Sequence, residues 1–585
     1  MKIIKDITVG SLKFTSEGTD TQRKVEEAVD KALAVAIPGA EYSPAFRSGH
    51  WDGKKHYYNF TTHSYPVGLT DKVVDTISDS FTGRVQYVID DIRPDAFVDV
   101  AKLPDKLTLD SPKGKDTFIL RDYQVTAVKR LFENCTGVIN YSVASGKTAI
   151  AAEIIKQLLP NLHDDERIAF FTNSSDIFSQ SIVNLEKFLS IKVGRLGGGK
   201  HDVRKVTVCM IPTVARAIAI DPEAKLNLTP RERITKKIAN KYYQMFKSVA
   251  SPRQALGNWL LMFKPKNKAD TALRATLSHV YKGSSTDLAV INSLKDFVAT
   301  YWETVKKKNK DKYKKRKRID DFLKSVVAFV ADECHHSKST TWIDVLLSCK
   351  NAIYRVGLSG SINKKDPVIT SALDGIYGSI IARKKSIDMI RRGIIAKPYI
   401  TMIPMTEPAT IAGLKKWQDI YKQGIVENTY RNQIVGALAA KWSASGRAVL
   451  IIVNQLAHAE LLSEILTSFN VKHDIINGAK TETERTGELN AIRTGKNKVL
   501  IATSVLDEGV DIDNIDVLLL AAGGKAPRQV IQRIGRVLRK NHNGGNKAYI
   551  YDFIDKQHRI LRKHSRERLQ IYRDEEYDVK MLKGG

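Results

Sequence analysis

Residues 137–159 read GVINYSVASGKTAIAAEIIKQLL, and this stretch decides the fold. It begins as an apolar strand pattern, turns tightly through Gly146-Lys147-Thr148, and continues as an apolar helix pattern. Backbone N–H groups of such a turn surround the phosphates of a nucleotide, while the Lys147 ammonium adds charge and the Thr148 hydroxyl suits Mg²⁺. The full pattern starts with Gly five residues before Gly146, where this chain has Tyr141. Taken alone, the turn therefore does not exclude an ordinary helix start without a role in phosphate binding.

Short apolar runs alternate with helical patterns on both sides of this stretch, from residue 118 onward. Buried runs of four to six residues are typical of strands in a parallel α/β sheet. The runs fall into two sets, at residues 137–143, 167–172, 205–211, 326–332 and 354–360, and at residues 448–454, 472–478, 498–504, 516–522 and 547–553. We therefore expect two α/β domains of similar design.

The run at residues 326–330 leads into two adjacent carboxylates, Asp332 and Glu333, followed by Cys334 and His335. Nucleotide sites lie at the carboxyl ends of parallel strands. There Asp332 can hold Mg²⁺, directly or through water, and Glu333 can orient and deprotonate an attacking water. An acidic pair at a strand end is often only a solvated turn, but this pair follows a phosphate-binding turn across an α/β sheet.

Residues 532–539 read QRIGRVLR, near the end of the second set of strands. On a helix, Arg536 and Arg539 share a face with Gln532, because residues three and four apart are neighbours there. Both guanidinium groups could then reach a γ-phosphate as arginine fingers. A basic helix face is usually only solvated, but the spacing favours the phosphate contact.

Together these motifs resemble those of the superfamily 2 helicases, in the family's order and over nearly all of residues 118–560. The resemblance implies an α/β fold with two tandem RecA-like domains, each a parallel sheet flanked by helices, and the use of ATP and Mg²⁺. Two departures from the family pattern, SVASGKT at the phosphate turn and Gly360 where Ala is usual, remove no phosphate or metal ligand. We therefore expect activity to survive them.

The resemblance also assigns roles to individual residues. Those implied in ATP binding are Arg121, Gln124 (against the adenine edge), Ala144, Ser145, Gly146, Lys147, Thr148, Gly509 and Asp511. Those implied in catalysis are Glu333, Gln532, Arg536 and Arg539, with Thr148 and Asp332 on Mg²⁺. Those implied in coupling hydrolysis to movement are His335, Ser359 and Ser361. Those implied to line the path of one strand are Thr172, Gly198, Thr213, Asn454 and Thr503.

A finer resemblance lies in residues 43–54 and 65–69, SPAFRSGHWDGK and YPVGL. They are similar to the N-terminal domain of the branch-migrating helicases of tailed phages. That implies 3′→5′ travel and action on forks, Holliday junctions and D-loops in recombination, repair and replication, with the RNA–DNA hybrids of R-loops as further substrates. Arg47 and Trp51 are our candidates for nucleic-acid contacts, by phosphate gripping and base stacking. The nearby aromatics at 46, 57 and 58 fit a small domain's core at least as well.

Charge agrees with a nucleic-acid partner, because the net charge of +29 draws the chain toward polyanions. The four cysteines form no CxxC pair, and no apolar run approaches the length of a membrane span. We therefore expect a cytoplasmic monomer without membrane contact. Three other readings stay open: a double-strand DNA translocase, a DExH RNA helicase, and a passive nucleic-acid-binding protein with a dead ATPase.

The predicted domains are an accessory α+β nucleic-acid-binding domain at 1–98, a linker at 99–116, and RecA-like domains at 117–395 and 396–585. The first RecA-like domain contains a basic, mainly helical insertion at 216–325. By count the insertion holds 26 Lys and Arg against 10 Asp and Glu, a net of +16. Its tail, residues 306–318, holds ten basic residues and one acid, which fits either a solvated loop or a phosphate-binding segment.

Overall fold

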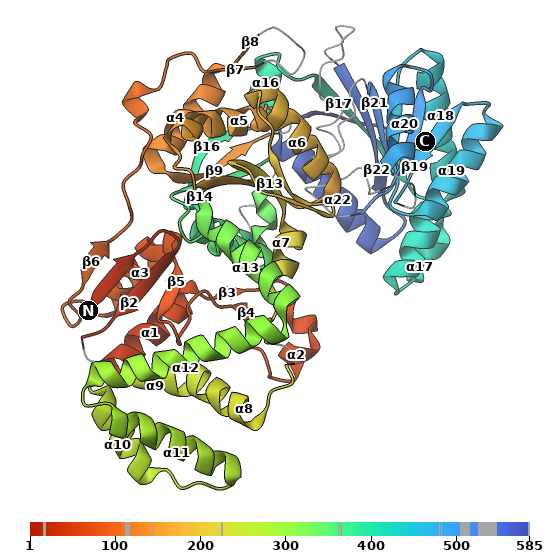
Figure 1. Cartoon of the computed structure of the whole chain (residues 1–585). Helices are drawn as coiled ribbons and strands as arrows, with labels where there is room; N and C mark the ends of the chain where they lie inside the picture. Colours follow the sequence, from red (N-terminus) through yellow and green to blue (C-terminus); the bar gives the residue numbers. More distant parts are fainter. Residues whose placement is uncertain are drawn as a thin grey trace. The chain divides into compact units, whose positions relative to one another are not determined.

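The computed structural model describes residues 1–15, 19–110, 117–142, 144–223, 226–360, 362, 366–478, 480, 482–503, 515–524 and 547–582. The chain forms two compact units (Figure 1). One joins Met1–Thr213 to Lys324–Gly585, and the other is Val214–Leu323. In the described part of the chain, no helix combines the length and the apolar character that crossing a bilayer requires.

The N-terminal part of the larger unit is a four-stranded sheet in the order β5-β2-β1-β6. Its elements are β1 (Lys2–Lys5), β2 (Val9–Lys13), α1 (Asp20–Leu33), β3 (Val35–Ala36), α2 (Pro44–Arg47), β4 (Lys54–Lys55), β5 (Ser64–Pro66), α3 (Thr70–Ser80) and β6 (Val88–Asp91). Helix α1 starts where the Thr19 hydroxyl accepts the Gln22 N–H, and its Val25 and Val29 pack with Val73 and Ile77 of α3. Helices alongside strands agree with the α+β character predicted for residues 1–98.

The first RecA-like domain is built on an eight-stranded sheet in the order β12-β11-β13-β10-β14-β15-β9-β16. All its strand pairs are parallel except β11 with β12. Its elements are α4 (Asp122–Asn134), β9 (Thr136–Tyr141), α5 (Lys147–Leu158), β10 (Arg167–Thr172), α6 (Ser175–Leu189), β11 (Gly194–Gly197), β12 (Lys200–Asp202), β13 (Val206–Met210), α7 (Ile211–Ile218), β14 (Val326–Asp332), α14 (Thr340–Leu347), β15 (Tyr354–Ser359), α15 (Pro367–Tyr377), β16 (Ile380–Lys384) and α16 (Ser386–Arg391).

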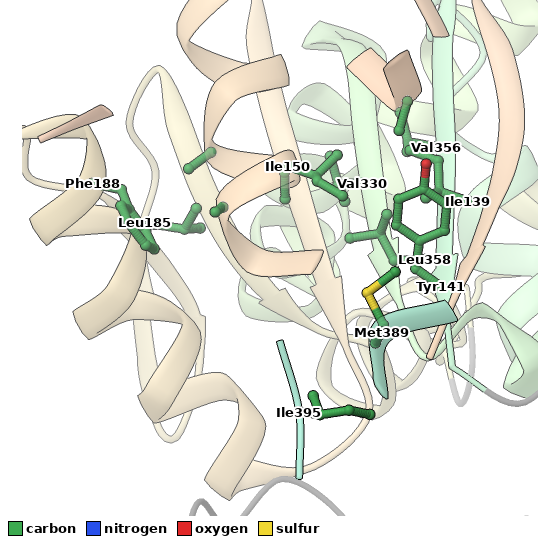
Figure 2. Packing of buried hydrophobic residues seen from close by; sticks show 14 of the residues in the cluster. Ile139, Tyr141, Ile150, Leu185, Phe188, Val330, Val356, Leu358, Met389 and Ile395 are labelled. Carbon is green, nitrogen blue, oxygen red and sulfur yellow. The ribbon is translucent and has the colours of Figure 1, made fainter. Parts of the chain in front are cut away.

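The core of this domain lies between the sheet and its helices. Figure 2 shows Ile139, Val330 and Val356, from three neighbouring strands, packed close to Ile150 of α5. All four side chains are at most 1% exposed. The strands between these helices are buried on both faces, which is why their sequences read as continuous apolar runs rather than as alternation.

The described part of the predicted linker, residues 99–110, packs against this domain. Strand β7 (Thr108–Asp110) pairs with β8 (Thr117–Ile119) and contacts α5 and α6. Leu103, Leu107 and Leu109 are buried in the same core cluster. Prolines interrupt helical periodicity in this segment, but they do not prevent spaced leucines from covering a core.

The second RecA-like domain has a seven-stranded parallel sheet in the order β19-β20-β18-β21-β22-β17-β23. Its elements are β17 (Lys397–Met405), α17 (Trp417–Tyr421), α18 (Thr429–Ala444), β18 (Val449–Ile452), α19 (Leu456–Ser468), β19 (His473–Ile476), α20 (Glu482–Arg493), β20 (Val499–Ala502), β21 (Val517–Leu520), β22 (Lys547–Asp555), α22 (Arg559–Asp574) and β23 (Asp578–Met581). The two sheets confirm the predicted fold class.

A buried ion network ties α22 to strand β22. The Arg568 guanidinium donates to Asp552 Oδ2 at 2.8 Å and Oδ1 at 3.0 Å, and also to the Gly524 carbonyl at 2.6 Å. Arg431 of α18 donates to Asp555 Oδ1 at 2.8 Å. All four charged side chains are at most 2% exposed, so each depends on its partner for compensation.

The smaller unit is helical, as predicted for the insertion. Its helices are α8 (Pro230–Lys237), α9 (Tyr243–Lys247), α10 (Pro252–Met262), α11 (Lys268–Gly283), α12 (Asp287–Lys308) and α13 (Lys310–Ser325). The lysine-rich tail is not a loop: it forms the end of α12 and most of α13. Ile319, Phe322 and Leu323 give α13 a buried side, which the charge count alone does not reveal.

Candidate ATP site and nucleic-acid interface

The carboxyl edge of the first RecA-like sheet gathers the predicted ATP residues. Strands β9, β14 and β15 are parallel neighbours, so their carboxyl ends meet at one edge. The phosphate turn follows β9, Asp332 ends β14 and Ser359 ends β15. Three motifs that lie far apart in sequence are thus brought together, as the family resemblance implies.

The phosphate turn has the backbone that a phosphate cradle needs. Ala144 and Gly146 have φ values of +63° and +81°, and helix α5 starts at Lys147. A side chain at Gly146 would meet the Gln124 amide at 2.3 Å, so this position requires glycine. The Lys147 ammonium folds over the turn and donates to the carbonyls of Tyr141 at 3.2 Å and Ser142 at 3.3 Å.

Side chains in the first turn of helix α4 form hydrogen bonds to this phosphate turn. Gln124 is fully buried, where it accepts the Arg121 backbone N–H at 2.8 Å and donates to the Ser145 carbonyl at 2.9 Å. The Tyr123 hydroxyl donates to the same carbonyl at 2.9 Å, and the Tyr141 hydroxyl donates to the Tyr123 carbonyl at 2.7 Å. Sequence reasoning did not assign roles to the two tyrosines. The signal was Tyr141 itself, standing where the phosphate-turn pattern has glycine.

The acidic pair lies next to Lys147. Burial and the Glu333 charge raise the pKa of Asp332, while Lys147 opposes that rise. Burial also acts to raise the pKa of Glu333, but the contacts with His335 and Lys147 outweigh it and hold the pKa below its usual range. Glu333 therefore stays ionised well into the acid range, whereas Asp332, with its pKa raised to about 6, is mostly ionised at neutral pH and begins to take up a proton just below it.

The residues present fit ATP and Mg²⁺. The turn offers N–H groups and the Lys147 ammonium to phosphate oxygens. Thr148 and Asp332 are half-buried and supply the oxygen ligands that Mg²⁺ prefers. These two residues would hold the metal, and Lys147 would hold the phosphates.

His335 joins the acidic pair to the end of β15. Its Nδ1 lies 3.1 Å from Glu333 Oε2 and 3.0 Å from the Ser359 hydroxyl. This brings together two of the three predicted coupling residues. The third, Ser361, lies outside the described residues, as do Gly509, Asp511, Gln532, Arg536 and Arg539.

A second set of contacts runs from the acidic motif to the neighbouring strand β10. The His336 ring stacks on Trp342 of α14, with centroids 5.9 Å apart and planes 26° apart. The Trp342 indole N–H donates to Asn173 Oδ1 at 3.3 Å. Asn173 directly follows Thr172, a predicted strand-contacting residue. Trp342 was not predicted from the sequence, because tryptophan on a short apolar helix reads as core.

The predicted strand-contacting residues all follow carboxyl ends of parallel strands. Thr172 ends β10, Thr213 lies in the first turn of α7 after β13, and Gly198, with φ of +56°, follows β11. In the second domain Asn454 follows β18 and Thr503 follows β20. Gly198 and Asn454 are exposed, whereas Thr172 and Thr503 are buried.

The aromatic residues of the N-terminal domain divide between surface and core. Tyr57 and Tyr58 are buried in the domain core, while Phe46 is 39% exposed. Arg47 is exposed and donates to the Glu41 carbonyl at 3.0 Å. Trp51 is half-buried, and its indole donates to the Lys54 carbonyl at 2.8 Å. Arg47 and Trp51 therefore keep accessible surface for a ligand.

Comparison with known proteins matches two family models to the chain. The model "Type III restriction enzyme, res subunit" matches residues 117–364, and the model "Helicase conserved C-terminal domain" matches residues 430–541. Each falls on one RecA-like domain.

Individual relatives agree with these models. "Putative helicase 22" of Sulfolobus islandicus filamentous virus is 28% identical over 44% of this chain and 47% of its own. "ATP-dependent DNA helicase uvsW" of Enterobacteria phage T4 is 24% identical over 52% of this chain and 62% of its own. The matches thus span about half the length of these curated relatives. The crystal structure of T4 UvsW aligns with a TM-score of 0.40 at 17% identity, over 99% of this chain and 98% of that one.

One family model on each RecA-like domain, the motifs gathered at one sheet edge, and these relatives lead to one conclusion: the chain belongs to the superfamily 2 helicases and resembles UvsW.

Proposed function

We propose that this protein is an ATP-dependent DNA helicase that travels 3′→5′ and remodels branched DNA in recombination, repair and replication. Its substrates are forks, Holliday junctions and D-loops, with R-loops as a further class. It works as a monomer in the cytoplasm. One observation supports this above the others: the sheet edge that carries Lys147, Asp332 and Glu333 also carries Thr172 and Thr213, the candidate strand contacts.

Contacts between side chains support coupling at that edge. Glu333 is linked to β15 through His335, and the same motif is linked to β10 through His336, Trp342 and Asn173. Movement of the Glu333 loop during hydrolysis therefore reaches the residue beside Thr172 through packed groups. A protein that only bound nucleic acid would not need this arrangement.

The chain's residues divide the work of hydrolysis among them. The phosphate turn and Lys147 bind the phosphates, Thr148 and Asp332 hold Mg²⁺, and Glu333 orients the attacking water and takes its proton. Bound Mg²⁺ neutralises charge that develops on the phosphates. Arg536 and Arg539 complete the site from the second RecA-like domain, so nucleotide binding and release close and open the two domains on the strand.

The name of the phage relative favours DNA over RNA as the substrate. A double-strand DNA translocase is the second candidate, because the model that matches residues 117–364 is that of a restriction-enzyme subunit. The two candidates share every ATP residue and differ in whether strands separate.

The test is ATP hydrolysis with forked DNA, linear duplex, single-stranded DNA and RNA, beside strand-separation and four-way-junction assays. We expect forked DNA to stimulate ATP turnover most and four-way junctions to be unwound. Turnover stimulated by duplex without strand separation would make the protein a translocase, and stimulation by RNA alone would make it an RNA helicase.

A further inference from the structure

Helices α10 and α11 form an antiparallel hairpin within the smaller unit (Figure 1). The turn between them covers residues 263–267, FKPKN. Asn267 caps α11 by accepting the Asp270 N–H at 2.9 Å. Neither predicted motif nor family resemblance assigns a role to this hairpin.

Two large apolar side chains project from its tip. Leu261 and Met262, the last two residues of α10, are each 83% exposed. They exceed every other apolar side chain of comparable size in the described residues, the next being Tyr42 at 73%. Exposure of this extent costs hydrophobic free energy, so a contact partner is the expected explanation.

Aromatic packing holds the residues next to the tip. The Phe263 ring stacks on Trp259, with centroids 4.3 Å apart and planes at 19°. Trp259 in turn packs edge-on against Tyr242, at 5.0 Å, and Leu260 is buried in the unit's core. Leu260 and Phe263 thus pack against the unit on either side of Leu261 and Met262, which point away from it.

Lysines surround the apolar tip. Lys264, Lys266 and Lys268 are exposed, and none forms an ion pair with a described carboxylate. The only acidic residue nearby in sequence, Asp270, is engaged by Lys237 at 3.3 Å. The tip thus combines bare apolar surface with three uncompensated positive charges, which fits a polyanion that also has apolar faces.

A groove of about 810 Å³ leads away from the tip between α10 and α11. Leu261 stands at its wall, and Arg253, Arg274 and Lys282 line it together with Asn258 and several hydroxyl groups. Arg253 packs over the Tyr281 ring at 4.6 Å. Asp287 is the one carboxylate in the lining, and it accepts the Arg253 backbone N–H at 2.7 Å.

We propose that this hairpin tip binds the branch point of DNA. Leu261 and Met262 pack against the last base pair of the duplex arm, and the three lysines hold the phosphates on either side. One separated strand lies in the groove beside them. Apolar side chains that insert at a base step unstack it at a cost of a few kcal/mol, which basic contacts to the backbone offset. The inference rests on the proposed action on branched DNA and names the group that opens the junction.

The experiment uses the full-length protein and a fork that carries 2-aminopurine in the base pair at the branch. Binding without ATP is expected to raise 2-aminopurine fluorescence, because the base unstacks. The double variant Leu261→Ser with Met262→Ser should lose that rise and separate forks about tenfold more slowly or worse. Met245→Ser, an exposed apolar position in α9, is the matched control.

The lysines are tested separately. Replacing Lys264, Lys266 and Lys268 by Ala should weaken fork binding and reduce the slope of log K against log salt by up to about 2.7, since each phosphate contact contributes about 0.9. Arginine at all three positions should restore both. Equal slopes for the wild-type and alanine variants would show that these lysines do not touch DNA.

The outcomes separate the inference from the proposed function. If the serine variant separates forks as fast as the wild type, the tip does not open junctions and the inference is overturned, while the helicase assignment stands. If the wild type separates no strands yet raises 2-aminopurine fluorescence through Leu261 and Met262, the helicase assignment fails and the tip assignment stands. Fluorescence that rises equally in both proteins overturns the tip assignment.

Discussion

The contact between His335 and Glu333 shows how single residues set the chemistry of the ATP edge. His335 bridges the Glu333 carboxylate and the Ser359 hydroxyl, at 3.1 and 3.0 Å. Burial would otherwise hinder ionisation of Glu333, and the histidine compensates for that. Sequence motifs name both residues, but they give neither this contact nor its effect on the carboxylate.

Substitutions at two positions are expected to abolish ATP hydrolysis while DNA binding persists. Lys147→Ala removes a phosphate contact, and Glu333→Gln removes the base while keeping its shape. Both should reduce ATP turnover by about 10²-fold or more, whereas DNA affinity in a filter-binding assay should stay within a factor of about three. A variant that loses DNA binding as well would count against our assignment of that residue to hydrolysis.

Trp342 should govern how strongly DNA stimulates hydrolysis. Trp342→Phe keeps an aromatic ring against His336 but removes the indole N–H that Asn173 accepts. We expect basal turnover to stay unchanged and stimulation by DNA to fall about fivefold, the loss of one hydrogen bond of about 1 kcal/mol.

Two further variants test whether this hydrogen bond is the cause. Asn173→Ala should give the same reduction in stimulation, and the double variant should give no more than either single one, because both remove one contact. Additive losses would show that Trp342 acts through its packing instead.

We expect His458 to make the second RecA-like domain less stable in acid. It is buried in α19, where its Nε2–H donates to Asn432 Oδ1 at 2.9 Å, and burial together with the Arg431 charge lowers its pKa to about 3. The unfolded chain binds a proton near pH 6.5, but the folded chain does not. Stability is therefore complete above about pH 6.5 and falls steadily as the pH drops toward 3, by about 2 kcal/mol at pH 5.

Thermal unfolding at pH 7.5 and pH 5.0 checks this expectation. His458→Gln keeps an amide donor but cannot ionise, so its Tm should fall less between the two pH values than that of the wild type. Equal decreases in Tm for both proteins would show that other groups cause the acid sensitivity.

At the scale of elements, the sequence predicts the buried strands better than it predicts a basic helix such as α13. The apolar run at 326–332 predicts strand β14, which spans the same residues, and the run at 547–553 predicts β22, which continues to Asp555. A strand buried on both faces has a continuous apolar sequence, so it can be predicted without knowing which strands lie next to it. Helix α13 is less predictable, because eight basic residues obscure the three apolar ones, Ile319, Phe322 and Leu323, that form its buried side.

The candidate site is likewise predictable only in part. Lys147, Asp332 and Glu333 belong to compact motifs, whereas Tyr123 and Trp342 act through contacts that only the folded chain creates. Gln124 illustrates the difference, since its motif implies contact with adenine and the structure shows its amide bound to Arg121 and Ser145. The adenine contact stays a prediction, as do the roles of Arg536 and Arg539.

The exposed face of α13 should contribute to DNA affinity. Lys314, Lys315, Lys317 and Arg318 are all exposed, and replacing them by Gln removes four charges while the buried side of the helix stays intact. The slope of log K against log salt should then fall by at most about 3.6. Arginine at the three lysine positions is the control, and it should bind like the wild type. A slope that does not change would mean that α13 is only a solvated face.

At the scale of the whole molecule, the insertion is a second folding unit within a helicase chain. It has its own core, in which Phe246, Leu256, Leu273, Leu277 and Leu294 are fully buried. Residues 214–323 are also numerous enough to form a domain of ordinary size.

We expect the fragment of residues 214–323 to fold by itself. Its far-UV circular dichroism should be helical, and it should melt cooperatively and bind forked DNA with strong salt dependence. A fragment that is unfolded at 25 °C would show that the core depends on the rest of the chain.

The ion network between α22 and β22 has a consequence for genetics. A stop codon anywhere between the codons for Asp555 and Arg568 would leave both RecA-like sheets nearly complete, yet Asp552 would lose its guanidinium partner deep in the second sheet. An uncompensated buried charge costs about 3–5 kcal/mol, a large part of a domain's whole stability. Nonsense alleles in this interval should therefore behave as null alleles, their products being cleared by proteolysis rather than persisting as inactive helicase.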